Sequence, residues 1–174
     1  LELPQGLAVA STRGVRLFTC DGRELHHFCP ADYVQSLCMT PDGKLLLAGT
    51  FSRGVRVIDL IACEVRQIPQ LDGLPHTPVR TMVAQDASTL LVGFDGDGVY
   101  ALDLRNWQTA PQFTKSNGLL NAMGVYSICL DHEQNVWVAT YTGGVAMLEP
   151  EEYPVALYRH RAGDTTMLPS FIKI

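Results

Sequence analysis

The sequence has few charged residues, no long apolar run and no clustered basic segment. Charged residues make up 18% of its 174 residues, and 13 Lys and Arg against 18 Asp and Glu give a formal net charge of −5. Nucleic acids and anionic membrane surfaces are recognised through clustered Lys and Arg, so no nucleic-acid partner is expected. No apolar run approaches the ~18 residues of a membrane span. Residues 1–10 lack the pattern of a signal peptide, so an exporting segment is not expected in this stretch.

Closely spaced cysteine pairs are also missing. The five cysteines, Cys20, Cys29, Cys38, Cys63 and Cys129, include no C-x-x-C pair, which argues against a zinc site or a thioredoxin-type motif. Small buried apolar residues are the simpler interpretation, above all for Cys38 and Cys129, which lie within apolar runs. The apolar share of 47%, with 15 Gly and 10 Pro, is that of one ordinary folded domain.

What the sequence does contain is an internal repeat. Residues 34–39, 79–84 and 125–130 align, with starts 45 and 46 residues apart. Each segment is followed by a polar turn, a second apolar run, a glycine turn and a third apolar run. The second runs are 45–49, 90–93 and 136–140, and the third runs are 55–59, 99–103 and 145–148. Weaker fourth runs lie at 65–68, 112–114 and 156–158.

Short apolar or β-branched runs separated by Gly, Asp, Asn or Pro predict strands rather than helices. Four antiparallel strands in about 45 residues is the size of one β-propeller blade. The sequence therefore predicts an all-β fold of about four blades. The expected blades are residues 1–33 (partial), 34–78, 79–124 and 125–170, with 171–174 as the first strand of the next or closing blade.

The two ends of the chain leave the closure of the ring open. The first unit shows strands at 7–10, 15–18 and 24–28 but no first strand, and residues 171–174 resemble an isolated first strand. That last strand could complete the first blade and close a small ring. We favour a piece of a larger ring, in which exposed sheet edges could pair with a second copy to form a homodimer.

Two positions of the repeat carry small residues. Gly49, Gly93 and Ala139 align, which predicts that a neighbouring blade approaches the backbone there. Gly14, Gly54, Gly98 and Gly144 recur at the turn into the third strand, which predicts a positive φ at that position.

The unit at 125–145 resembles the two-component regulator propeller repeat. It has the Asp-led turn at Asp131, a Trp in the second strand at Trp137, and the ending Thr140-Tyr141-Thr142-Gly143-Gly144. The linkers at 73–79 and 118–125 look like the Gly-Leu segment of that family, and 160–171 looks like its His, Asp, Ser/Thr, Leu variant. The other units carry Leu46 and Leu91 in place of the Trp, so WD40-like or other propeller repeats stay open.

The resemblance implies a function that composition does not show. Proteins of this family are mostly hybrid two-component sensor histidine kinases of Bacteroidetes-type bacteria, with seven-bladed propellers outside the inner membrane, and many respond to oligosaccharides. It implies a non-catalytic, periplasmic ligand-sensing segment of an inner-membrane protein, with other blades of the parent protein as neighbours. A protein-interaction scaffold without a phosphorelay is the alternative, and a propeller lyase or glycan hydrolase is a third hypothesis.

No residue pattern favours catalysis, a metal or a cofactor. The segment Asp95-Gly96-Asp97-Gly98 resembles the start of a calcium loop, but Asn106 stands where an EF-hand needs a carboxylate. No Gly-x-Ser-x-Gly elbow is present. The acidic group at 149–152 is expected to be a solvated loop. The histidines are expected in turns or at strand ends without metal spacing, at His26, His27, His76, His132 and His160.

Ligand contact is expected on one face of the blades. In propellers, the loops before the first strand and between the second and third strands share the mouth of the central channel, and binding usually occurs on such loops. Their aromatic and hydrogen-bonding side chains suit a sugar or another small molecule. The candidate ligand-binding residues are Phe51, Arg53, His76, Asp95, Asp97, Asn121, Tyr141 and Thr142.

Overall fold

The structure of the chain is a computed structural model that describes residues 1–4, 6–114, 120 and 122–148. These residues form four antiparallel sheets in chain order. Sheet 1 holds β1 (Glu2–Leu3), β2 (Gly6–Ser11), β3 (Gly14–Phe18) and β4 (Glu24–Phe28), and sheet 2 holds β5 (Val34–Met39), β6 (Leu45–Thr50), β7 (Val55–Asp59) and β8 (Glu64–Arg66). Sheet 3 holds β9 (Val79–Ala84), β10 (Thr89–Phe94), β11 (Gly98–Asp103) and β12 (Thr109–Phe113), and sheet 4 holds β13 (Val125–Leu130), β14 (Val136–Thr140) and β15 (Gly144–Leu148). The predicted all-β fold of antiparallel blades is confirmed.

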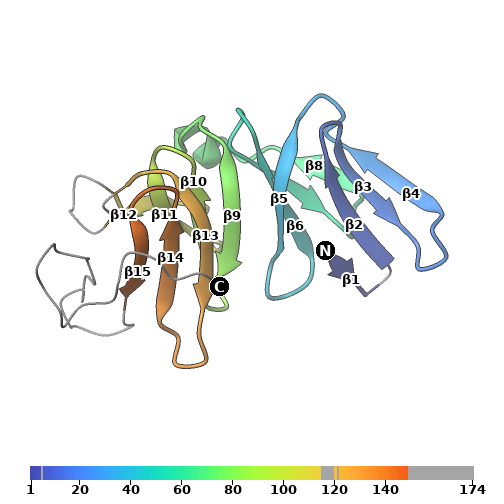
Figure 1. The fold of residues 1–174 in the computed structure, drawn as a ribbon. Coiled ribbons are helices and arrows are strands. Elements are labelled where there is room, and N and C mark those ends of the chain that lie inside the picture. The colour runs from blue at the N-terminus through green and yellow to red at the C-terminus, as the bar shows by residue number, and fades with distance from the viewer. Residues whose placement is uncertain (5, 115–119, 121, 149–174) are drawn as a thin grey trace, which may run out of the picture.

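The sheets stand side by side and fan out from one another (Figure 1). Contacts between neighbouring sheets run through their inner strands, with β2 against β5, β5 against β9 and β9 against β13. Each sheet is a simple meander in which every strand pairs with the next in sequence. The first strands of successive sheets therefore line the inner side of the fan, as they do around the axis of a propeller.

Two short elements were not predicted from the sequence, β1 and a 3-10 helix. Residues Glu2–Leu3 form β1 and pair with β2, so the expectation that the first unit lacks a first strand is wrong. Two residues are too short for alternation to reveal, although Leu3 is 5% exposed. A 3-10 helix, η1 (Pro69–Gly73), follows β8. The expected strands at 156–158 and 171–174 lie outside the described residues.

The repeated glycines have the predicted roles. The φ angles at the turn into the third strand are +85° at Gly14, +61° at Gly54, +81° at Gly98 and +80° at Gly144. A Cβ on Gly49 would lie 2.5 Å from Cγ1 of Val79 in the next sheet. Neighbouring sheets therefore pack directly against backbone at that position.

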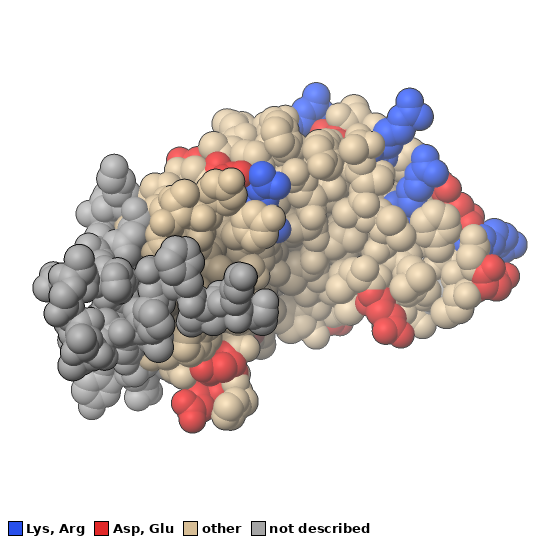
Figure 2. All heavy atoms as spheres, in the orientation of Figure 1, with Lys and Arg blue, Asp and Glu red and all other residues tan. Residues whose placement is uncertain are grey.

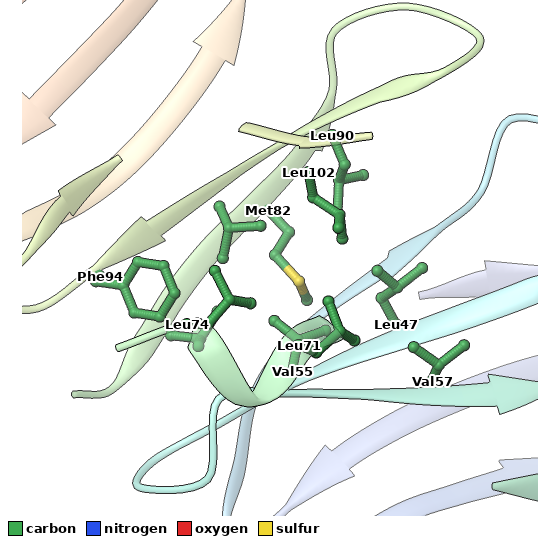
Figure 3. Packing of buried hydrophobic residues seen from close by; sticks show 11 residues of the cluster. Leu47, Val55, Val57, Leu71, Leu74, Met82, Leu90, Phe94 and Leu102 are labelled. Atoms are coloured by element: carbon green, nitrogen blue, oxygen red, sulfur yellow. The ribbon is translucent and has the colours of Figure 1, made fainter. Parts of the chain in front are cut away.

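Three apolar clusters hold the fan together, one between each pair of neighbouring sheets. The central cluster joins Leu47 and Val57 of sheet 2 to Leu90 and Leu102 of sheet 3. Figure 3 shows Leu71 and Leu74, from and after η1, entering this cluster beside Val55 and Met82. The 3-10 helix thus closes the widening outer part of the gap between the two sheets, and the stability of each sheet depends on its neighbour.

Several side chains differ from expectation. Cys129 is exposed and Cys38 is half-buried, so burial of both is wrong. Cys129 lies on a face of sheet 4 that no described residue covers. His26 and His27 lie within β4 rather than in a turn. Trp107 packs against the central cluster, partly buried. Within the described ranges, no helix has the length and hydropathy of a membrane span.

Candidate ligand-binding surface

The second residue of each complete first strand sits in a β-bulge. The pairing of β5 with β6 steps from Val34 to Ser36 and omits Gln35. The pairing of β9 with β10 omits Arg80 in the same way, and that of β13 with β14 omits Tyr126. The alignment of the repeats places these three residues at one equivalent position. A bulge bends its strand and re-aims the extra side chain, and bulges recur next to binding sites.

The three bulge residues converge on one open hollow of about 530 Å³. Its other lining residues come from the β2–β3 turn and from the start of β5. The hollow therefore spans all four sheets at a single end. We call this end the rim: it is the end where first strands begin and second strands finish. We call this hollow, together with the smaller one described below, the concave surface.

A second set of equivalent residues borders the concave surface. Phe51, Asp95 and Tyr141 each follow a second strand directly. Their backbone N–H groups donate to the carbonyl oxygens of Tyr33, Pro78 and Gly124, respectively, at 2.8 to 2.9 Å. The backbone at each of these positions is thus held against the segment that leads into the first strand of the same sheet. Of the predicted residues, Phe51, Asp95 and Tyr141 share this position.

Exposed aromatic side chains concentrate at the rim. Of the five exposed Phe, Tyr and Trp side chains in the described part of the chain, four lie here, with exposed fractions from 45% to 78%. They are Tyr33, Phe51, Tyr126 and Tyr141. The rings of Tyr33 and Phe51 stack with centroids 5.6 Å apart and planes 8° from parallel. Single exposed aromatic side chains scattered over a surface need no special explanation, whereas a cluster of them indicates a binding surface.

An ion pair joins the two sets of residues. Both Nε and Nη2 of Arg80 donate to Oδ2 of Asp95, at 3.0 and 2.7 Å. Beside this pair lies a smaller hollow of about 290 Å³, lined by Arg80, Asp95, Val125 and Tyr126 together with Gly124 and Tyr141. The two hollows share Arg80 and Tyr126 and so form one surface. The turn between β10 and β11, which carries Asp95, is held against sheet 4 because the N–H groups of Gly96 and Gly98 donate to the Met123 carbonyl oxygen just before β13.

The remaining predicted residues are placed differently. Arg53 forms an ion pair with the buried carboxylate of Asp32 at 3.2 Å. Arg53 and His76 line a niche of only about 40 Å³, the size for water and not for an organic ligand. Asp97 accepts a hydrogen bond from Thr77 Oγ1 at 2.6 Å. Thr142 is exposed beside Tyr141, and Asn121 lies outside the described residues.

Tyr33, Gln35, Arg80 and Tyr126 were not anticipated from the sequence. The predicted residues lie in loops, whereas these four lie at or just before the start of first strands. A signal was present, since the repeat alignment puts Gln, Arg and Tyr at one position inside otherwise matching apolar runs. A large polar or aromatic residue that recurs at a single strand position indicates a side chain that has left the blade interior.

No group of three or more metal-binding side chains exists among the residues that the structure describes. The segment 95–98 is the turn between β10 and β11, with Asp95 held by Arg80 and Asp97 by Thr77. Most charged side chains in view lie singly or in small mixed groups (Figure 2). The carboxylates with lowered pKa in the first-to-second-strand turns, Asp42, Asp86 and Asp131, lie at the end opposite the rim, where hydrogen bonds stabilise the charged form.

Comparison with known proteins identifies the repeat. Residues 119–142 match the family described as two component regulator propeller. This stretch contains most of sheet 4, with Tyr126 and Tyr141, and confirms the resemblance for that unit. No curated protein sequence matches the chain.

Two solved structures share the fold. One is described as the extracellular domain of a hybrid two component system, BT4673, from B. thetaiotaomicron, with 24% identity and a TM-score of 0.75 over 93% of this chain and 21% of that chain. The other is described as the extracellular domain of a one component system BT4673 from the same organism, with 16% identity and a TM-score of 0.64 over 80% and 19%. This chain spans about a fifth of the length of either structure. These matches confirm the predicted fold over the part of the chain that they cover.

Proposed function

We propose that this chain is part of the extracytoplasmic sensing propeller of a two-component sensor histidine kinase, and that its concave surface binds an oligosaccharide. The match of residues 119–142 to the two component regulator propeller family carries the proposal, because that unit supplies Tyr126 and Tyr141 to the surface. The similar structures, described as extracellular domains, support a periplasmic location. The chain's own role is binding rather than catalysis.

The shape and chemistry of the surface support a saccharide ligand. Exposed aromatic rings offer flat apolar faces to the C–H face of a sugar, and the polar groups of Gln35, Arg80 and Asp95 offer partners to its hydroxyls. Gln35 Oε1 is buried and has no hydrogen-bond partner among the described residues. A buried acceptor without a partner is costly, so we expect the Gln35 amide to turn toward the hollow when a ligand donor is bound there.

Binding is tested by calorimetric titration of the chain with a panel of plant and host-glycan oligosaccharides. We expect at least one to bind, and we expect Tyr126→Ala to weaken that binding at least ten-fold. Trp137→Ala should not weaken it, because Trp137 is an exposed aromatic residue away from the rim.

Signalling is tested by the complete reading frame, which should encode a membrane span followed by a histidine kinase. A frame that ends in another module would favour an interaction scaffold.

A further inference from the structure

The Arg80–Asp95 pair leaves one acceptor and several donors facing the smaller hollow. Only Oδ2 of Asp95 receives the guanidinium. Among the described residues, Oδ1 accepts no hydrogen bond, and Arg80 Nη1 donates none. Oδ1 lies beside Gly124, since a Cβ built on that glycine would be 3.1 Å from it. A carboxylate oxygen and a guanidinium N–H therefore stand side by side at the wall of a hollow that has no side chain on its Gly124 side.

The charges of the concave surface cancel. Among the described residues, Arg80 and Asp95 are the only ones with charged side chains that line the two hollows. An acidic ligand would be attracted by Arg80 but repelled by the Asp95 carboxylate. A cationic ligand would be attracted by Asp95 but repelled by Arg80. The pair is 36% and 39% exposed, so it stays partly hydrated until a ligand covers it. Such a site favours groups that both donate and accept hydrogen bonds, which hydroxyls do.

We infer that Arg80 and Asp95 recognise two adjacent hydroxyls of a neutral sugar ring, with Arg80 donating to one hydroxyl and Asp95 Oδ1 accepting from the other. This inference rests on the proposed function, the binding of an oligosaccharide, and adds that the bound sugar is neutral. Tyr126 and Tyr141, which line the same hollow, present aromatic faces to the ring. The larger hollow continues from Arg80 and Tyr126 toward Gln35 and Tyr33. Further sugar units of the oligosaccharide lie along it.

The experiment compares neutral and acidic oligosaccharides of equal length by calorimetric titration of the chain. The neutral set comprises tetrasaccharides of glucan, mannan, xylan and galactan, and the acidic set comprises oligogalacturonide and chondroitin sulfate tetrasaccharides. We expect a binder in the neutral set only. Its affinity should change less than two-fold between about 50 mM NaCl, where charges are weakly screened, and about 500 mM NaCl, where they are strongly screened, because the ligand carries no net charge. An acidic binder overturns the inference but leaves the proposed function standing, and no binder in either set overturns both.

Variants test the residues. Asp95→Asn and Arg80→Gln should each weaken binding of the neutral ligand at least ten-fold, and Gly124→Ala should weaken it while the ion pair stays intact. Arg105→Gln is the matched control, because Arg105 and Asp103 form a comparable surface ion pair at the end opposite the rim. Circular dichroism verifies that each variant is folded. Equal binding by wild type, Asp95→Asn and Gly124→Ala overturns the assignment.

Discussion

Single residues decide how closely the sheets approach. Gly93 is the clearest case, since a Cβ there would lie 2.6 Å from Thr81 Cγ2 and 2.7 Å from Val125 Cγ1 of the next sheet. Both distances are shorter than van der Waals contact, so one sheet must move when a methyl group is added.

Gly93→Ala should therefore lower the free energy of unfolding by about 1–3 kcal/mol, the usual cost of overpacking. Urea unfolding followed by circular dichroism measures it. Gly73→Ala is the control, because a Cβ on Gly73 meets nothing within 4 Å, and its midpoint should stay near that of wild type. Equal midpoints for Gly93→Ala and wild type would show that the neighbouring sheets can separate without cost.

The turn at Asp131 makes stability sensitive to acid. Hydrogen bonds from the Trp137 indole N–H and the Asn135 side chain lower the pKa of Asp131 to about 2. The unfolded value is ~3.9. Since the folded pKa is the lower one, the stabilisation is complete above pH ~4 and is lost as the pH falls through about 2.

Asp131→Asn should consequently lose less stability than wild type between pH 4 and pH 2. Trp137→Phe lacks the indole donor that lowers the folded-state pKa of Asp131, so it should also lose less stability than wild type over this range. Urea titrations at several pH values give both curves. Parallel curves for wild type and Asp131→Asn would mean that this carboxylate does not contribute to the acid response.

At the scale of elements, the sequence pattern predicts strands that alternate or run apolar over four or more residues. The second and third strands appear where expected, because they are short apolar runs and a glycine turn separates them. Strand β1 and the helix η1 were missed, since neither is long enough to show a period. The equivalence of residues also needed the structure. Cys129 pairs with Trp137 and Cys38 with Leu47, so Leu47, not Leu46, occupies the Trp position.

The bulges were beyond prediction for a related reason. A bulge is a property of pairing between two strands, and the sequence of one strand does not reveal which residue its partner omits. The loop residues Asp95 and Tyr141 could be foreseen as rim residues, whereas Arg80 and Tyr126 needed the register of β9 and β13.

Strand β1 is expected to be essential despite its length. Leu3 is buried in the cluster between sheets 1 and 2, so Leu3→Ala should cost about 2–5 kcal/mol. Leu25→Ala in β4 removes the same atoms from an exposed site and should cost far less. Thermal or urea unfolding of both variants makes the comparison, and equal losses would place β1 outside the core.

At the scale of the whole molecule, the end sheets resemble interior sheets with a partner removed. Leu47 and Leu91 are buried beneath the next sheet, whereas the equivalent Trp137 is 36% exposed. On the other end of the fan, Leu7 and Val9 of β2 are exposed although the equivalent face of sheet 2 is buried. Both faces expose apolar side chains at positions that are buried between neighbouring sheets elsewhere in the chain, which supports the proposed place inside a larger ring.

The isolated chain should therefore self-associate through these faces. Sedimentation velocity over a range of concentrations should show species larger than a monomer, and Val9→Asp should shift the distribution toward the monomer. Ile61→Asp is the control, because Ile61 is exposed in a turn away from either end face. A strictly monomeric wild-type chain would instead favour closure of a small ring.

The claim that joins fold to function is that ligand binds at the rim. Amide hydrogen exchange of the chain, with and without a saturating neutral oligosaccharide identified by titration, tests it directly. Protection should rise at residues 33–35, 79–81, 95–97 and 124–126, which come from three different sheets. Protection confined to the opposite turns, at residues 42–44, 86–89 and 131–135, would contradict the account.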